Sequence, residues 1–138
     1  MGLDMFAFRH KGERLNRETN YEELAEDNKP EEISYWRKHN RLQGWFENLY
    51  YKKHDGEDLK WHSFNNVPLY LSRDDLIKLR EEIKNKTLPE TTGFFFGGDS
   101  YQWDKNEVEE QMKYDLDFIK QAIESIDKGY KVFYECSW

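Results

Sequence analysis

The stretch EEISYWRKHNRLQGWF, residues 31–46, decides how the chain is interpreted, because it concentrates four aromatic side chains and three cations in an acidic protein. Apolar and aromatic residues recur there at intervals of three or four, which is typical of the core-facing side of a helix. This stripe consists of Tyr35, His39, Leu42, Phe46 and Leu49. We therefore predict a helix from residue 31 to about residue 51, with Pro30 placed in its first turn.

A polar face of the same predicted helix is a candidate ligand site. Arg37, Asn40, Arg41 and Gly44 share that face, so two guanidinium groups and an amide could meet an anion beside an indole ring. Aromatic rings also stack on nucleobases, which favours a nucleotide-like ligand. The candidate ligand-binding residues are Tyr35, Trp36, Arg37, His39, Asn40 and Arg41. In the competing interpretation, the rings belong to the core and the cations are solvated surface residues.

Length and charge restrict the class of protein. A chain of 138 residues is the size of one domain, residues 1–138, and 17% aromatic residues are enough to build a core. A net charge of -7 argues against general binding of nucleic acid or of anionic membranes. The N-terminus has no basic start or signal-length apolar run, and Cys136 is the only cysteine, so we expect a protein of the reducing cytoplasm.

The flanking segments predict a mixture of strands and helices. Residues 3–8 and 130–135 alternate as strands that are apolar on both faces, and residues 67–71 form a short strand that Pro68 places at an edge. Residues 9–30 are a polar surface excursion with one helical turn near residues 21–26. The glycine-bounded run at 93–98 indicates a short buried strand and turn.

Two further helices have clear boundaries. Ser72 and Asp75 form a capping box before a helix at residues 73–86. Its buried stripe is Leu76, Leu79 and Ile83. Another helix ends before Gly129, with Asp104 or Asn106 as its N-cap. Its predicted core stripe is Val108, Met112, Leu116, Ile119, Ile123 and Ile126. The fold class is therefore α+β: a small antiparallel or mixed sheet that includes both terminal strands as neighbours, with about three helices packed on it.

Several motifs resemble a family of small, uncharacterised phage and prophage proteins. They are the opening MGLDM at 1–5, YWRK at 35–38 with Asn40 and Trp45-Phe46, GFFFG at 93–97, and Phe133-Tyr134 with Ser137-Trp138 at the end. His39 and the pair Glu135-Cys136 depart from the family pattern. The resemblance implies a phage accessory protein that acts in a bacterial cytoplasm and modulates a host system, including a defence system.

Catalytic motifs are weak. His10, His39, His54 and His62 show no spacing typical of zinc ligands, so we expect no metal and no cofactor. The run at 93–98 lacks the lysine and hydroxyl residue of a phosphate-binding loop, and no serine-centred elbow occurs. The acids Asp115 and Asp117 look like an accidental pair among 28 carboxylates.

Two classes of function follow. We favour a non-enzymatic binding protein that captures an anionic small molecule or docks on a host protein, and the alternative is a small hydrolase of nucleotide or phosphodiester substrates. The sequence leaves the oligomeric state open.

Overall fold

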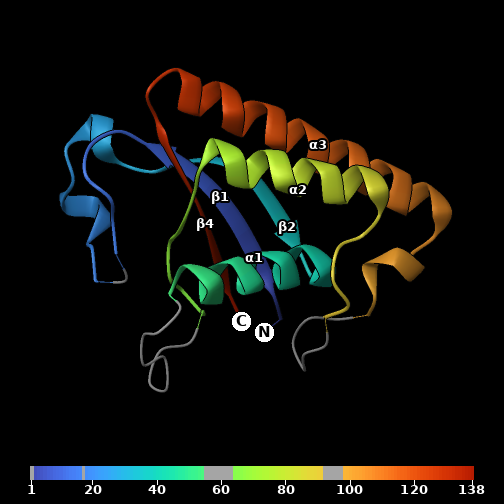
Figure 1. Cartoon of the computed structure of the whole chain (residues 1–138). Coiled ribbons are helices and arrows are strands. Elements are labelled where there is room, and N and C mark those ends of the chain that lie inside the picture. Colours follow the sequence, from blue (N-terminus) through green and yellow to red (C-terminus); the bar gives the residue numbers. More distant parts are fainter. Residues whose placement is uncertain (1, 17, 55–63, 92–97) are drawn as a thin grey trace.

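The computed structural model describes residues 2–16, 18–54, 64–91 and 98–138 (Figure 1). It contains one four-stranded sheet in the order β2-β1-β4-β3, in which every pair of neighbours is antiparallel. The strands are β1 (Asp4–His10), β2 (Glu31–Arg37), β3 (Leu69–Leu71) and β4 (Lys131–Ser137). The predicted α+β class is confirmed.

The terminal strands β1 and β4 are neighbours, as predicted. They pair along their whole length, from Asp4 opposite Ser137 to His10 opposite Lys131. The two chain ends therefore lie close together at one end of the sheet (Figure 1). β3 is an edge strand, which agrees with the position of Pro68 just before it.

Three α-helices cover one face of this sheet (Figure 1). They are α1 (Asn40–Lys53), α2 (Arg73–Asn85) and α3 (Lys105–Asp127). The capping box at the start of α2 is confirmed, because Ser72 Oγ accepts the Asp75 N–H and the Asp75 carboxylate accepts the Ser72 N–H. Among the described residues, no helix is long and apolar enough to cross a membrane.

The main core fills the space between the sheet and the helices. Inward residues of the strands, such as Met5 and Tyr134, meet inward residues of the helices, such as Phe46 and Phe118. The rings of Phe46 and Tyr134 stack with centroids 3.9 Å apart, which joins α1 to β4. Cys136 is also buried in this core, and burial raises the pKa of its thiol to about 12.

The opposite face of the sheet is partly covered by residues 11–16 and 18–30. This segment contains two 3₁₀ turns, at Tyr21–Glu23 and Glu26–Asn28, where the sequence predicts a single helical turn. Leu15 packs there against Tyr70 and Phe133 in a second, smaller core.

The predicted helix from residue 31 is wrong in its first part. Residues Glu31–Arg37 form β2, which pairs with β1, and the helix begins only at Asn40. A left-handed residue, Lys38 (φ 54°), separates the two elements. Consequently Pro30 precedes a strand, and Tyr35 lies on the outer face of the sheet with 40% of its surface exposed. The predicted stripe combined residues of the strand and of the helix, so its helical spacing ran across this turn.

The core stripe of α3 is also rotated from its prediction. The buried residues are Asp115, Phe118, Ile119, Ala122 and Ser125, and the other predicted stripe residues lie half-buried beside them. Asp104 occupies the N-cap position without a side-chain hydrogen bond to the helix. The predicted strand at 93–98 lies, apart from Gly98, outside the described residues.

Candidate functional site

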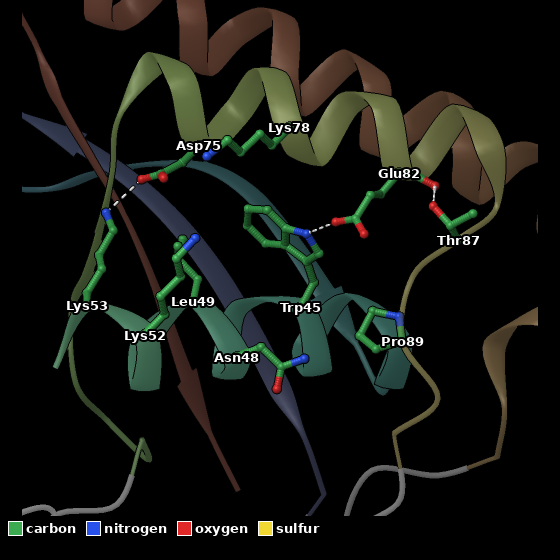
Figure 2. Close-up of a pocket in the computed structure, with 10 residues that line it drawn as sticks. All are labelled: Trp45, Asn48, Leu49, Lys52, Lys53, Asp75, Lys78, Glu82, Thr87 and Pro89. Atoms are coloured by element: carbon green, nitrogen blue, oxygen red, sulfur yellow. Dashed lines mark hydrogen bonds and ion pairs between the residues drawn. The ribbon is translucent and has the colours of Figure 1, made fainter. Parts of the chain in front are cut away.

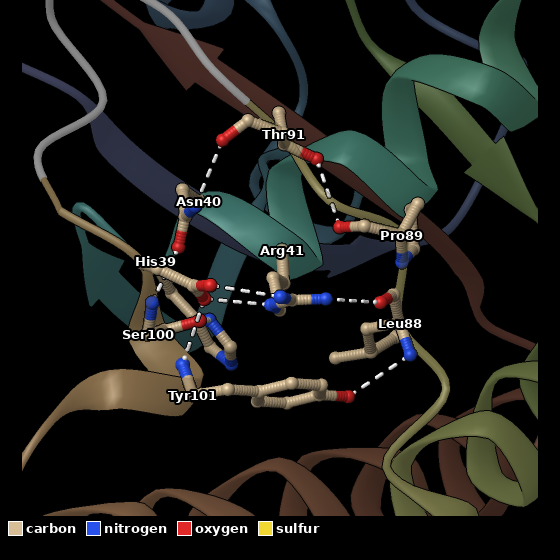
Figure 3. A network of polar contacts seen from close by, with 9 residues as sticks. His39, Asn40, Arg41, Leu88, Pro89, Thr91, Ser100 and Tyr101 are labelled. Carbon is tan, nitrogen blue, oxygen red and sulfur yellow. Dashed lines mark hydrogen bonds and ion pairs between the residues drawn. The ribbon is translucent and has the colours of Figure 1, made fainter.

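The first polar centre lies at the corner between β2 and α1, where Asn40 joins two loop segments (Figure 3). Its Nδ2 donates to the carbonyl oxygen of Thr91 (2.9 Å), and its Oδ1 accepts the N–H of Ser100 (2.8 Å). One helical turn later, a Cβ on Gly44 would collide with the Thr91 side chain, so a larger residue here would displace Thr91. Asn40 therefore links Thr91 to Ser100, and Gly44 leaves room for the Thr91 side chain against α1.

Arg41 is committed to the same corner. Its Nε and Nη2 donate to the two carboxylate oxygens of Asp99 (2.6 and 2.8 Å), and its Nη1 donates to the carbonyl oxygen of Leu88 (2.9 Å). The guanidinium also lies 4.1 Å from the centre of the Tyr101 ring. Hydrogen bonds from Arg41 lower the pKa of Asp99 to about 2. Arg41 therefore neutralises a carboxylate of its own chain.

A buried chain of side chains runs from Ser100 through His39 to Asp115. Ser100 Oγ lies 3.1 Å from His39 Nδ1, and His39 Nε2 lies 2.9 Å from Asp115 Oδ2. The other oxygen of Asp115 accepts from Trp36 Nε1 and Gln111 Nε2, both at 2.8 Å. Neither the sequence spacing nor any motif indicates this grouping, and the sequence interpretation treats Asp115 as an accidental acid.

The order Ser-His-Asp is that of an activated nucleophile, its base and the group that orients the base. Catalysis also needs space for a substrate and donors for the developing negative charge. The cavity that His39, Ser100 and Asp115 line has a volume of only about 20 Å³, and the Ser100 N–H already donates to Asn40. In the described part of the chain, this arrangement joins the segments that carry His39, Ser100 and Asp115 by hydrogen bonds.

The six predicted site residues do not converge on one anion site. His39, Asn40 and Arg41 belong to the corner, and the Trp36 indole is buried against Asp115. Tyr35 donates its hydroxyl to Asp4 Oδ1 (2.6 Å), and Arg37 also has a partner. Tyr35, Trp36 and Arg37 line a separate hollow beside α3.

A ligand-sized groove lies elsewhere, between α1 and α2 (Figure 2). Its volume is about 520 Å³, within the range of about 300 to 1,000 Å³ that small-molecule sites occupy. The lining residues are Trp45, Asn48, Leu49, Lys52, Lys53, Asp75, Lys78, Glu82, Thr87 and Pro89. Figure 2 shows the Trp45 ring standing between the two helices.

The two ends of the groove hold different polar contacts. At one end, Lys53 Nζ donates to Asp75 Oδ2 (2.6 Å) and to the carbonyl oxygen of Tyr70 (2.7 Å). Burial alone would raise the pKa of Asp75, but hydrogen bonds from Lys53 and Ser72 outweigh it and lower this pKa. At the other end, Trp45 Nε1 donates to Glu82 Oε2, which fixes the indole ring.

Lys52 and Lys78 extend from opposite walls of the groove, one from α1 and one from α2 (Figure 2). Both are exposed, and within the described ranges neither makes a hydrogen bond or an ion pair. The sequence does carry a signal for this groove. Trp45, Leu49 and Lys52 share one helical face at steps of four and three, and α2 presents a facing side through Lys78.

No protein family model, no curated protein and no solved structure matches the chain. In the parts of the chain that the structure describes, no group of three histidine, cysteine, aspartate or glutamate side chains could hold a metal ion.

Proposed function

We propose that this protein is a non-enzymatic binding protein that captures a small anionic, nucleotide-like ligand in the groove between α1 and α2. The observation that carries the proposal is the pair of ammonium groups of Lys52 and Lys78, which make no hydrogen bond or ion pair with the described residues and face each other across a cavity of ligand size. A phosphate group between them would receive charge-assisted hydrogen bonds from both walls.

The groove also offers a surface for the rest of such a ligand. Trp45 lies seven residues before Lys52, which is about 10 Å along a helix at 1.5 Å per residue. A nucleoside with one phosphate extends over a comparable distance, so its base would reach the indole while its phosphate reaches the lysines. The hydrogen bond to Glu82 holds the indole in place before the ligand arrives, which reduces the entropy lost on binding.

The phage resemblance supplies a context for this activity. A phage accessory protein that captures a nucleotide-like signal in the bacterial cytoplasm would lower the free concentration of that signal and so modulate the host system that responds to it. This step is an analogy with the family and adds no residue to the site.

A hydrolase is the second candidate, and the buried series Ser100-His39-Asp115 favours it. This candidate predicts that Ser100→Ala abolishes hydrolysis of a nucleotide ester and that an active-site fluorophosphonate labels the wild-type protein. The small cavity at Ser100 favours binding over hydrolysis, so we expect no labelling of the folded protein.

Mass spectrometry of small molecules released by denaturing the purified protein tests the proposed binding. We expect a phosphate-bearing aromatic compound from the wild type and its loss from the double variant Lys52→Met with Lys78→Met. The matched control is Lys113→Met with Lys120→Met, because these lysines are exposed on α3 and outside the groove. Equal recovery from all three proteins would contradict the proposal.

A further inference from the structure

A second concave surface lies between β2 and the first half of α3, away from the groove. It has a volume of about 470 Å³, and four of its eight lining residues are aromatic. Tyr35 and Tyr114 expose 40% and 43% of their surfaces, and Trp103 is half-buried beside them. The Trp36 ring, edge-on to Tyr114 at 5.9 Å, forms the buried side.

The polar groups of these rings are already used within the chain. Tyr35 donates its hydroxyl to Asp4, Tyr114 accepts the backbone N–H of Tyr35 (3.0 Å), and the Trp36 indole donates to Asp115. These three aromatic side chains therefore offer a ligand mainly the surfaces of their rings. Ring surfaces of this kind attract cations through the negative potential of their π faces.

Two carboxylates complete the hollow. Glu107 and Glu110 line it from α3, three positions apart on one side of the helix, and neither forms an ion pair within the described residues. The cation of the hollow itself, Arg37, places its guanidinium beside Gly2, within 3.2 Å of where a Cβ on that glycine would be. The net charge presented by these three side chains is negative.

We propose that this hollow receives an arginine side chain of a basic partner protein. A guanidinium is planar, stacks on aromatic rings, and has N–H groups on several sides that can reach both Glu107 and Glu110. The net charge of -7 would steer a basic partner toward this protein from a distance. The hollow shares no lining residue with the groove between α1 and α2, so the two sites can be tested separately.

The test titrates the full protein with a short peptide that carries one arginine in an otherwise uncharged sequence, followed by tryptophan fluorescence and calorimetry. The comparison peptide has citrulline, which keeps the shape and removes the charge. We expect saturable binding of the arginine peptide and at least a tenfold weaker association of the citrulline peptide. Equal binding of the two peptides would overturn the proposal.

Variants locate the binding. The double variant Glu107→Gln with Glu110→Gln should bind the arginine peptide at least tenfold more weakly. Glu109→Gln changes an exposed neighbour outside the hollow and should leave the affinity unchanged. Trp103→Ala should weaken binding without removing either carboxylate. Full binding by the double glutamine variant would refute the site, and free arginine amide binding as tightly as the peptide would refute the assignment to a protein partner.

Discussion

The corner between β2 and α1 and the groove between α1 and α2 contain similar kinds of residues, yet they differ in whether their polar side chains already have partners within the described chain. At the corner, Arg41 donates three hydrogen bonds and Asn40 donates one and accepts one, all within the chain. In the groove, Lys52 and Lys78 face open space. A cation beside an aromatic ring therefore indicates a ligand site only when the chain has not already supplied the anion.

The largest expected effect lies at the corner. Asp115→Ala would leave the donors of Trp36, His39 and Gln111 without an acceptor, in a site where Asp115 is only 2% exposed. Removing one member of such a buried group typically costs about 3 to 5 kcal/mol. The free energy of unfolding from urea titration measures this. The control is Asp117→Ala, because Asp117 lies two positions later on α3 and is exposed. This variant should change stability by no more than about 0.5 kcal/mol. Similar losses in both variants would contradict the assigned role of Asp115.

A smaller loss is expected at Asn40, and its control lies on the same helix in the groove. Asn40→Ala leaves the Ser100 N–H and the Thr91 carbonyl unpaired, which should lower stability by about 1 to 3 kcal/mol. Asn48→Ala removes an exposed amide from the groove lining and should be nearly neutral. If the two variants melt at the same temperature, the distinction between corner and groove is wrong.

Acid should weaken the corner through Asp99. Its pKa in the folded protein is about 2, below the ordinary value of 3.8, so the folded state binds a proton less readily than the unfolded chain. The resulting stability is present above about pH 4 and is lost as the pH falls through about 2. Asp99 is partly exposed, so we expect about 1 kcal/mol. The stability gap between wild type and Asp99→Asn, followed from pH 6 to pH 2, should close over this range. A gap independent of pH would show that the Asp99 charge does not contribute.

The sequence predicts most of the fold because local signals and burial agree there. The Ser72-Asp75 capping box, the stripe of α2 and the doubly apolar terminal strands each correspond to one observed element. Residues 31–37 mislead because Tyr35 and His39 keep helical spacing across a turn at Lys38 that no glycine or proline marks. Within the strand, the buried residues Ser34 and Trp36 alternate with the exposed residues Tyr35 and Arg37. This two-residue period is typical of a strand.

The candidate site was harder to predict than the fold. Arg41 is not available to a ligand because it pairs with Asp99, 58 residues later. His39 pairs in the same way with Asp115, 76 residues later. Pairings across such distances follow from packing and leave no local pattern. The groove, in contrast, follows from helical spacing in α1 and α2, but recognising it requires knowing that these two helices face each other.

The smallest expected change in stability, and the most direct test of the proposed binding, concerns the groove lysines. Lys52→Met with Lys78→Met should leave the ligand-free free energy of unfolding within about 0.5 kcal/mol of the wild type, because both side chains are exposed and have no polar partner among the described residues.

The decisive measurement is thermal melting of wild type and of this double variant, alone and with a panel of nucleoside mono-, di- and cyclic phosphates. A ligand at one hundred times its Kd stabilises the native state by about 2.7 kcal/mol. We predict that at least one nucleotide raises the melting temperature of the wild type and leaves that of the double variant unchanged. If no nucleotide raises the wild-type melting temperature, or if one raises both proteins equally, the groove is not an anion site.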